Sequence, residues 1–386
     1  MDPSRIAPLL EPMKIRGIEL PNRVIMSPMS RSASPGGVPG ADVAAYYRKR
    51  ADGGVGTIFT EAVCIEHPGA IGEFGMGDGR TPYLWGEAAL AGWRRVVREV
   101  HAAGSLIFPQ LMHLGVMKRP GSGGAYREDQ VGGPSGFWGP AGRPTGLDAE
   151  TIDALDRPGR ALSESEIVEI IGAYAASARN AKTVGFDGIA LHGGHGYLID
   201  NFLWEGTNAR SDRWGGDHVQ RTRFAVEVVR AVRAAVGEDM PISFRYSQWK
   251  PQDFTARLAR SPRELEEILG PIADAGVDIF EASTRDFADP AFEDSSSSLA
   301  GWTRKLTGKP TAMVGGVAVR RGKFDSTLTP PETIDNLVEI MERHARGEFD
   351  LLAVGRALLN DPQWLRKARS GDPFLPFDPA CLRALA

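Results

Sequence analysis

The sequence predicts a single (β/α)8 barrel, because eight short apolar runs rich in β-branched residues alternate with stretches of helical periodicity. The runs are Val24–Met29, Gly56–Thr60, Ser105–Leu111, Gly188–Leu191, Pro241–Tyr246, Val277–Glu281, Pro310–Val314 and Phe349–Val354. Barrels of this kind often exceed about 250 residues as one unit. All 386 residues, 1–386, are therefore expected to form one domain.

Composition indicates an ordinary soluble globular protein, with 42% apolar and 24% charged residues and no long uninterrupted apolar run. A net charge of -4 without a Lys/Arg block argues against a nucleic-acid partner. The first residues lack the layout of a secretory signal, and Cys64 and Cys381 are the only cysteines. We expect a cytoplasmic protein, a monomer or homodimer, without an iron–sulfur cluster, a metal site or a membrane partner.

Two helices have readable ends. Ser163-Glu164-Ser165-Glu166 is a capping box that predicts a helix through about Thr183, with Gly185 as its left-handed exit. Pro330-Pro331-Glu332 predicts the start of another helix, which ends near Gly347.

Three segments are expected to lie at the ends of the barrel. Residues 13–20 alternate around a glycine turn and predict a β-hairpin lid over the N-terminal mouth. The long Gly- and Pro-rich stretch at about 114–162, after the third run, predicts a cover loop over the opposite mouth. Thr284–Ser298 predicts a second, mobile loop on that same face.

Polar residues collect where the apolar runs end, which is where barrels of this class place their chemistry. His192, His195 and Tyr197 directly follow the fourth run. Other residues at run ends are Pro28, Met29, Ser30, Glu61, Ala62, Gln110, Arg245, Ser283, Gly315, Gly316, Gly355 and Arg356. Two imidazoles and a phenol at one such end predict a catalytic site.

The glycine turns after the seventh and eighth runs indicate a phosphate site, because exposed backbone N–H groups can hold an anion there. Barrel turns also need glycine for purely structural reasons, so Gly315, Gly316 and Gly355 leave both readings open. Arg356, a bidentate anion donor, favours phosphate.

Taken in order along nearly the whole chain, these motifs resemble the old yellow enzyme family of FMN-dependent ene-reductases. The motifs that carry the resemblance are Pro28-Met29-Ser30-Arg31, Thr60-Glu61-Ala62, Gln110-Leu111-Met112-His113, His192 to Tyr197, Asn208 to Gly216, Gly315-Gly316 and Val354-Gly355-Arg356.

The resemblance implies a tightly bound, non-covalent FMN. Pro28, Met29 and Ser30 would line the flavin, with Ser30 near its O4 and N5 edge and Ala62 packed on that edge. Gln110 would pair with the pyrimidine ring, and Arg245 would face N1 and O2, where a fixed guanidinium stabilises the reduced ring. Gly315, Gly316, Gly355 and Arg356 would hold the ribityl phosphate, and His192 also borders the cofactor.

The resemblance further implies that His192 and His195 hold an activating carbonyl oxygen, as an oxyanion hole does. Tyr197 would give a proton to the α-carbon of the alkene, since a phenol with its ordinary pKa, about 10, is protonated at neutral pH. Met112 stands where many members of the family have a bulkier aromatic residue, which would widen the substrate pocket. A structural or zinc-binding role for the histidines, and a core role for Tyr197, stay open.

The expected reaction is hydride transfer from NADH or NADPH to FMN, then from flavin N5 to the β-carbon of an activated alkene, either an α,β-unsaturated carbonyl or a nitro compound. No strand-linked G-x-G-x-x-G motif is present, so the nicotinamide would bind transiently over the flavin. Three alternatives remain: an FMN-dependent amine dehydrogenase or demethylase, a flavin-free lyase or isomerase acting on a phosphorylated substrate, and a non-catalytic flavoprotein.

A few residues fall outside this reading. Trp249 and Lys250 follow Arg245 in an unusual continuation, for which packing on the solvent side is the expectation. His67 and His113 are expected to be surface or turn histidines, and Cys64 a small buried residue.

Overall fold

The barrel is closed in a computed structural model that describes residues 3–71, 80–117, 131–140, 159–322, 325 and 329–385. Its strands are β3 (Val24–Met26), β4 (Thr57–Cys64), β5 (Leu106–Met112), β8 (Ile189–His192), β9 (Ile242–Ser247), β10 (Ile279–Ser283), β11 (Thr311–Val314) and β14 (Leu351–Val354). Each strand pairs in parallel with its neighbours, and β14 closes the ring against β3. All eight predicted runs are confirmed as barrel strands, although β3 ends before Met29 and β4 extends past Thr60.

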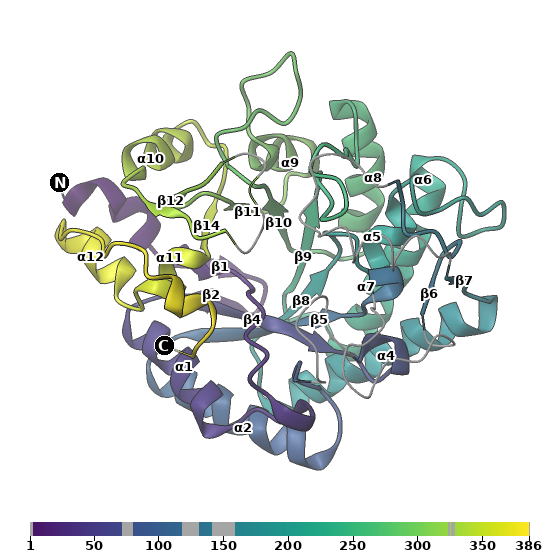
Figure 1. Cartoon of the computed structure of the whole chain (residues 1–386), viewed down its shortest axis with the longest axis horizontal. Coiled ribbons are helices and arrows are strands. Elements are labelled where there is room, and N and C mark those ends of the chain that lie inside the picture. The colour runs from purple at the N-terminus through teal and green to yellow at the C-terminus, as the bar shows by residue number, and fades with distance from the viewer. Residues whose placement is uncertain are drawn as a thin grey trace.

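Helices surround the strands, as Figure 1 shows. The longer ones are α1 (Ala41–Asp52), α2 (Glu87–Ala102), α4 (Glu164–Val184), α7 (Arg223–Val236), α8 (Pro262–Asp274), α9 (Leu299–Thr307) and α10 (Leu337–Ala345). Shorter ones are α5 (Leu198–Leu203), α6 (His218–Arg221), α11 (Arg356–Asn360) and α12 (Trp364–Ser370). Apolar helix faces and the outward-facing side chains of the strands form one large buried core.

The predicted capping box is confirmed, because the Ser163 hydroxyl accepts from the Glu166 N–H and the Glu166 carboxylate accepts from the Ser163 N–H. Gly185 ends α4 in the left-handed conformation, with φ of 102°.

The helix start predicted at Pro330-Pro331-Glu332 is wrong. Glu332–Thr333 form β13, which pairs antiparallel with β12 (Val319–Arg320), and α10 begins only at Leu337. The Ile334 N–H donates to the Ala318 carbonyl, so this backbone is committed to a β pairing instead of a helical turn.

The N-terminal hairpin is confirmed as β1 (Met13–Ile15) and β2 (Ile18–Leu20). Ile15 and Leu20 pack into the interior barrel cluster with Phe59 and Phe108, and the Gly17 N–H donates to the Asp239 carbonyl ahead of β9. The hairpin therefore lies against the N-terminal ends of the strands.

Most of the predicted cover loop lies outside the described residues. Its described parts include β6 (Gly132–Gly133) and β7 (Arg160–Ala161), which pair in parallel. No helix among the residues described above is both long enough and apolar enough to cross a membrane.

Candidate active site

The carboxyl ends of the strands surround a cleft of about 740 Å³, including its open mouth. Eight of the predicted site residues line it: Pro28, Met29, His195, Arg245, Gly315, Gly316, Gly355 and Arg356. Ser30 is exposed and is not among the side chains that line this cleft. Positions spread over more than 300 residues of chain are thus brought together at one mouth of the barrel.

His192, His195 and Tyr197 lie together at the end of β8. The His192 ring is 5.1 Å from the His195 ring and 4.6 Å from the Tyr197 ring, centroid to centroid. His195 has a φ of 59° and Gly196 a φ of 74°, so the turn between the histidines and the tyrosine runs through left-handed backbone. Such a conformation is costly at a non-glycine residue and is kept only where surrounding contacts enforce it.

Both imidazoles are held in their neutral form. Burial, and then the nearby Arg245 guanidinium, lowers the pKa of His192 and of His195 well below the ordinary value. His195 Nε2 lies 3.0 Å from Ser283 Oγ, which also accepts a 3.1 Å hydrogen bond from Arg245. Because the Ser283 hydroxyl oxygen already accepts from Arg245, we assign the hydroxyl proton to the bond with His195 Nε2. The Nδ1 atom of His195 then carries the ring proton and is the donor nitrogen.

Arg245 lies over a buried acid that the sequence analysis did not assign. Its Nη1 is 3.2 Å from Glu281 Oε1, and Ser27 Oγ donates to that same oxygen over 3.1 Å. Burial raises the pKa of Glu281, and the Arg245 charge opposes that rise. Arg245 Nε is buried and has no partner among the described residues.

Gln110 and Ala62 are neighbours on adjacent strands, β5 and β4. Gln110 is 1% exposed, and its Nε2 has no partner among the described residues. Ala62, Met112 and Leu114 form one buried apolar cluster, and Tyr197 packs against this cluster. Met112, a predicted residue of the substrate pocket, therefore belongs to the cluster on which the Tyr197 phenol packs.

The glycine turn after β11 approaches the backbone after β10 closely. Gly315 has a φ of 122°, and a Cβ there would lie 2.4 Å from the Thr284 carbonyl oxygen. Gly316 also has a positive φ, 70°. Only glycine allows this backbone to line the cleft, as a phosphate cradle requires.

Three arginines gather beside this turn. Burial and then the neighbouring Arg321 and Arg285 charges lower the pKa of Arg356 to about 9. Burial and then Arg321 lower the pKa of Arg285 to about 10. Mutual repulsion of this kind would be relieved by a bound dianion.

The described residues fit FMN. A buried amide nitrogen at Gln110 and a buried guanidinium nitrogen at Arg245 both need acceptors, which the pyrimidine edge of a flavin offers. The glycine turn with its arginines provides a place for the phosphate. Arg245 and the anion cradle line the same cleft, which matches the two ends of that molecule.

Sequence reasoning missed several of these residues and placed one wrongly. Arg285 follows the end of the barrel strand β10, a position that could have indicated it, whereas Arg321 follows the short strand β12. Lys250 was expected on the solvent side and is instead fully buried, because it pairs with Asp200. Trp249 lies with its ring centroid 4.7 Å from that of His195, at the rim of the site.

Two other histidine expectations have different outcomes. His67 is a turn residue as expected, since its Nδ1 accepts from the Gly69 N–H. His113 is also a turn residue, since its Nδ1 accepts from the Gly115 N–H, but it is buried, with Nε2 lying 2.8 Å from His67 Nδ1, so only the surface position is wrong. Cys64 is buried as expected.

Fold and site together define a flavin-binding parallel barrel with neutral imidazole donors and a phenol beside the cofactor cleft. The model of the NADH:flavin oxidoreductase / NADH oxidase family matches residues 8–374. The chain belongs to this family, that of the old yellow enzymes, whose cofactor is FMN.

Individual relatives align with this chain over most of its length. NADH oxidase of Thermoanaerobacter brockii is 31% identical over 360 residues, which are 93% of this chain and 50% of that protein. A chanoclavine-I aldehyde reductase of Penicillium roqueforti is 31% identical over 377 residues, 96% of this chain and 92% of the relative. The solved structure of morphinone reductase superposes with a TM-score of 0.76 at 26% identity, covering 97% of this chain and 92% of the other. The chain thus spans about half the length of NADH oxidase, and nearly all of the other two.

Proposed function

We propose that this protein is an ene-reductase that transfers hydride from NADH or NADPH, through FMN, to the β-carbon of an activated alkene. The observation that carries the proposal is the cluster of His192, His195 and Tyr197, of which His195 lines the cleft together with Arg245. When bound, FMN supplies a ring that accepts a hydride from one substrate and delivers it to the next.

His192 and His195 bind the carbonyl or nitro oxygen of the alkene. Because burial and Arg245 keep both rings neutral, each ring has one N–H to donate and no net charge to attract a free anion. Two such donors stabilise the negative charge that grows on the oxygen as the β-carbon gains hydride. They also orient the alkene over the cleft.

Tyr197 donates the proton to the α-carbon. Its ring packs between the His192 ring and the apolar side chains of Ala62, Met112 and Leu114. This packing beside the two imidazoles supports the proposed role, because a proton donor has to be held close to the bound alkene.

The residue roles predicted for the cofactor carry over into this proposal. Pro28 and Met29 line the ring, Gln110 and Arg245 bind its pyrimidine edge, and Arg356 binds the phosphate with the glycine turns. Ser30 and Ala62 remain assigned to the O4 and N5 edge by resemblance.

Names of relatives support a carbonyl-activated substrate. A putative 12-oxophytodienoate reductase of Oryza sativa, morphinone reductase and chanoclavine-I aldehyde reductase are each named for a ketone or an aldehyde. An enone or enal is therefore the first substrate class to test, followed by nitroalkenes.

The alternatives find less support. Relatives that resemble trimethylamine dehydrogenase carry a cysteine cluster, whereas this chain has two cysteines in all. A flavin-free lyase would leave Gln110 Nε2 and Arg245 Nε buried without acceptors, at a cost of roughly 1–3 kcal/mol each.

Anaerobic stopped-flow spectroscopy tests the proposal. The flavin absorbance band at about 450 nm should bleach on mixing with NADH or NADPH and return when an enone is added. A protein without that band would be a flavin-free barrel, and one that bleaches without any return would be a flavoprotein of another kind.

We also propose the cytoplasm as its location. Cys64 and Cys381 are free thiols within the described residues, which suits a reducing compartment. A monomer or homodimer remains the prediction for its assembly.

A further inference from the structure

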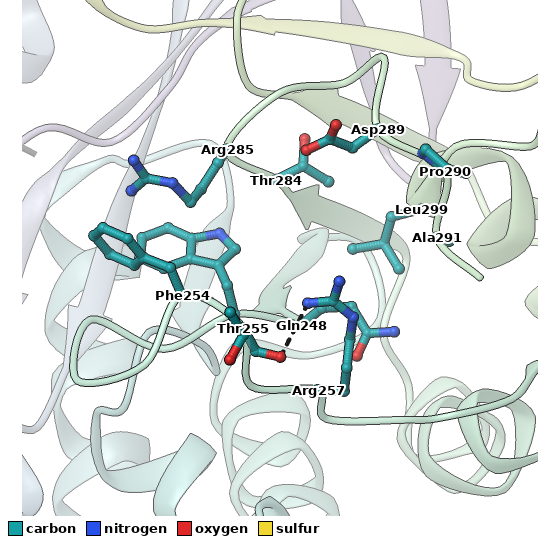
Figure 2. A pocket seen from close by; sticks show the side chains of 11 residues that line it. Gln248, Phe254, Thr255, Arg257, Thr284, Arg285, Asp289, Pro290, Ala291 and Leu299 are labelled. Carbon is teal, nitrogen blue, oxygen red and sulfur yellow. Dashed lines mark hydrogen bonds between the residues drawn. The ribbon is translucent and has the colours of Figure 1, made fainter. Parts of the chain in front are cut away.

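A second hollow lies beside the cleft, between the segment that follows β9 and the segment that follows β10. It holds about 760 Å³, including its opening, and Figure 2 shows the side chains around it. Trp249, Thr284 and Arg285 line both this hollow and the cofactor cleft. A molecule that reaches from one space to the other would therefore pass over these three residues.

Arg257 presents a cation to the hollow. Its side chain is exposed, and Nη1 donates only to the backbone carbonyls of Thr255, at 3.3 Å, and Ala256, at 3.1 Å. Among the described residues no carboxylate forms an ion pair with it. Asp289 stands on the opposite side of the hollow in Figure 2, so the two charges face each other across open space.

The segment that carries Arg257 is held in place before any ligand binds. Gln248 Oε1 accepts from the N–H groups of Leu258 and Ala259, at 2.8 and 2.9 Å, and Gln248 Nε2 donates to the Ala259 carbonyl. Because Gln248 is buried directly after β9, these bonds tie the loop to the barrel. Because the backbone next to Arg257 is already fixed, no loop has to be ordered when the side chain binds an anion.

Apolar side chains form much of the remaining wall, together with Thr255, Thr284 and the Arg285 guanidinium, which stacks on the Phe254 ring. Phe254, Ala291 and Leu299 are buried, and Trp249 presents an indole whose buried Nε1 has no partner among the described residues. The hollow therefore suits a planar group with a hydrogen-bond acceptor at one edge and an anion near Arg257. Asp289 can accept a hydrogen bond from an amino group on that planar body.

We propose that this hollow binds the adenosine end of NADPH, with the 2′-phosphate on Arg257. The inference rests on the proposed function, since the nicotinamide must lie in the cleft while the rest of the dinucleotide leaves it. Adenine is planar, bears ring acceptors and an amino group, and in NADPH carries a phosphate on the adjoining ribose. NADH lacks that phosphate, so Arg257 makes the protein prefer NADPH.

Calorimetric titration of the oxidised holoenzyme with adenosine 2′,5′-bisphosphate and with adenosine 5′-phosphate tests the site without turnover. The bisphosphate should bind the wild type more tightly, and Arg257→Gln should weaken its binding roughly tenfold to hundredfold, as expected for loss of a charged hydrogen bond. Arg260→Gln is the matched control, because Arg260 lies on the same loop and pairs with Glu205 instead of lining the hollow. Equal affinity of the wild type for both nucleotides, or an equal loss in the two variants, overturns the proposal.

Stopped-flow reduction of the flavin gives the second readout. Arg257→Gln should raise the apparent dissociation constant for NADPH by that same factor and leave the constant for NADH in place. A rise for both dinucleotides, or for neither, also overturns the proposal. Failure of the proposed function is a separate result, in which reduced flavin is not reoxidised by any alkene although the bisphosphate still binds.

Discussion

Lys250 Nζ lies 2.7 Å from Asp200 Oδ1, and both side chains are fully buried behind the turn from His192 to Tyr197. The second carboxylate oxygen of Asp200 accepts from the Gly196 N–H at 2.7 Å. Lys250 also donates to the Ser247 carbonyl, and Ser247 Oγ accepts from the His195 N–H at 2.9 Å. The ion pair thus holds the left-handed backbone between His195 and Tyr197 from two sides.

Lys250→Met should destabilise the protein and slow the alkene half-reaction more than flavin reduction. Removing one partner leaves the Asp200 carboxylate buried and unpaired, which costs about 3–5 kcal/mol of unfolding free energy. The relaxed turn also misplaces His195 and Tyr197, which the proposed mechanism uses most in the second half-reaction. Urea unfolding and stopped-flow measurement of each half-reaction check both effects.

Arg233→Met is the control for that variant. Arg233 pairs with Asp278 in another buried ion pair, at the N-terminal ends of β9 and β10 and away from the catalytic turn. Arg233→Met should lower the unfolding free energy, while the ratio of the rates of the two half-reactions stays as in the wild type. If the ratio of the two half-reaction rates were also unchanged in Lys250→Met, the ion pair of Lys250 and Asp200 would have a structural role only.

Tyr197→Phe should leave flavin reduction by NAD(P)H nearly intact and slow alkene reduction by roughly 10²- to 10⁴-fold, the usual contribution of a general acid. The two rates are measured separately under anaerobic conditions. Tyr83→Phe, which removes a hydroxyl from a ring stacked on Trp85, serves as the control. Equal slowing of both half-reactions would exclude Tyr197 as the proton donor.

Arg356→Gln should weaken FMN binding by roughly tenfold to hundredfold, because it removes one charged donor from the phosphate cradle. Affinity for riboflavin, which has no phosphate, should not change. Fluorescence titration of the flavin-free protein with each ligand measures the difference. Arg366→Gln on α12 is an exposed control, and a matching loss of riboflavin affinity would mean that Arg356 binds some other part of the cofactor.

Much of this architecture could be predicted because its signals are local. Each barrel strand is a short apolar run, and the cluster of His192, His195 and Tyr197 follows one run directly, so periodicity and position indicate where both lie. Lys250 could not be placed in this way, since its partner Asp200 lies on another element and no local pattern joins them. The helix start predicted at Pro330 is wrong for the same reason. Pairing with strand β12 holds these residues in a β conformation, although their sequence is favourable for the start of a helix.

Acid should destabilise the native protein through His195. Its folded-state pKa is lowered by burial and then by Arg245, whereas in the unfolded chain it has the ordinary value, about 6.5. Below that pH the unfolded chain binds a proton that the native state does not, so unfolding free energy falls as pH falls. As the pH is lowered from about 7.5 to about 5.5, the unfolding free energy of His195→Asn should therefore rise relative to that of the wild type. Urea unfolding with excess FMN measures this difference.

His101 gives the opposite sign. A hydrogen bond to Asp187 raises its pKa, so its contribution to stability is present below the ordinary pKa and is lost as pH rises through the raised one. His101→Gln should cost more stability at low pH than at high pH. The same pH trend in both variants would contradict the assignment of His195 as a neutral native residue.

Beneath the cleft, Arg245 is anchored by Glu281 and Ser27, and all three belong to or adjoin barrel strands. The charge proposed for the pyrimidine edge of the flavin is therefore fixed by the barrel strands, whereas His195, Tyr197 and Arg257 lie on the connections that follow strands. Related proteins could exchange those connections, and with them their substrates, while the reduction potential of the ring stays nearly constant.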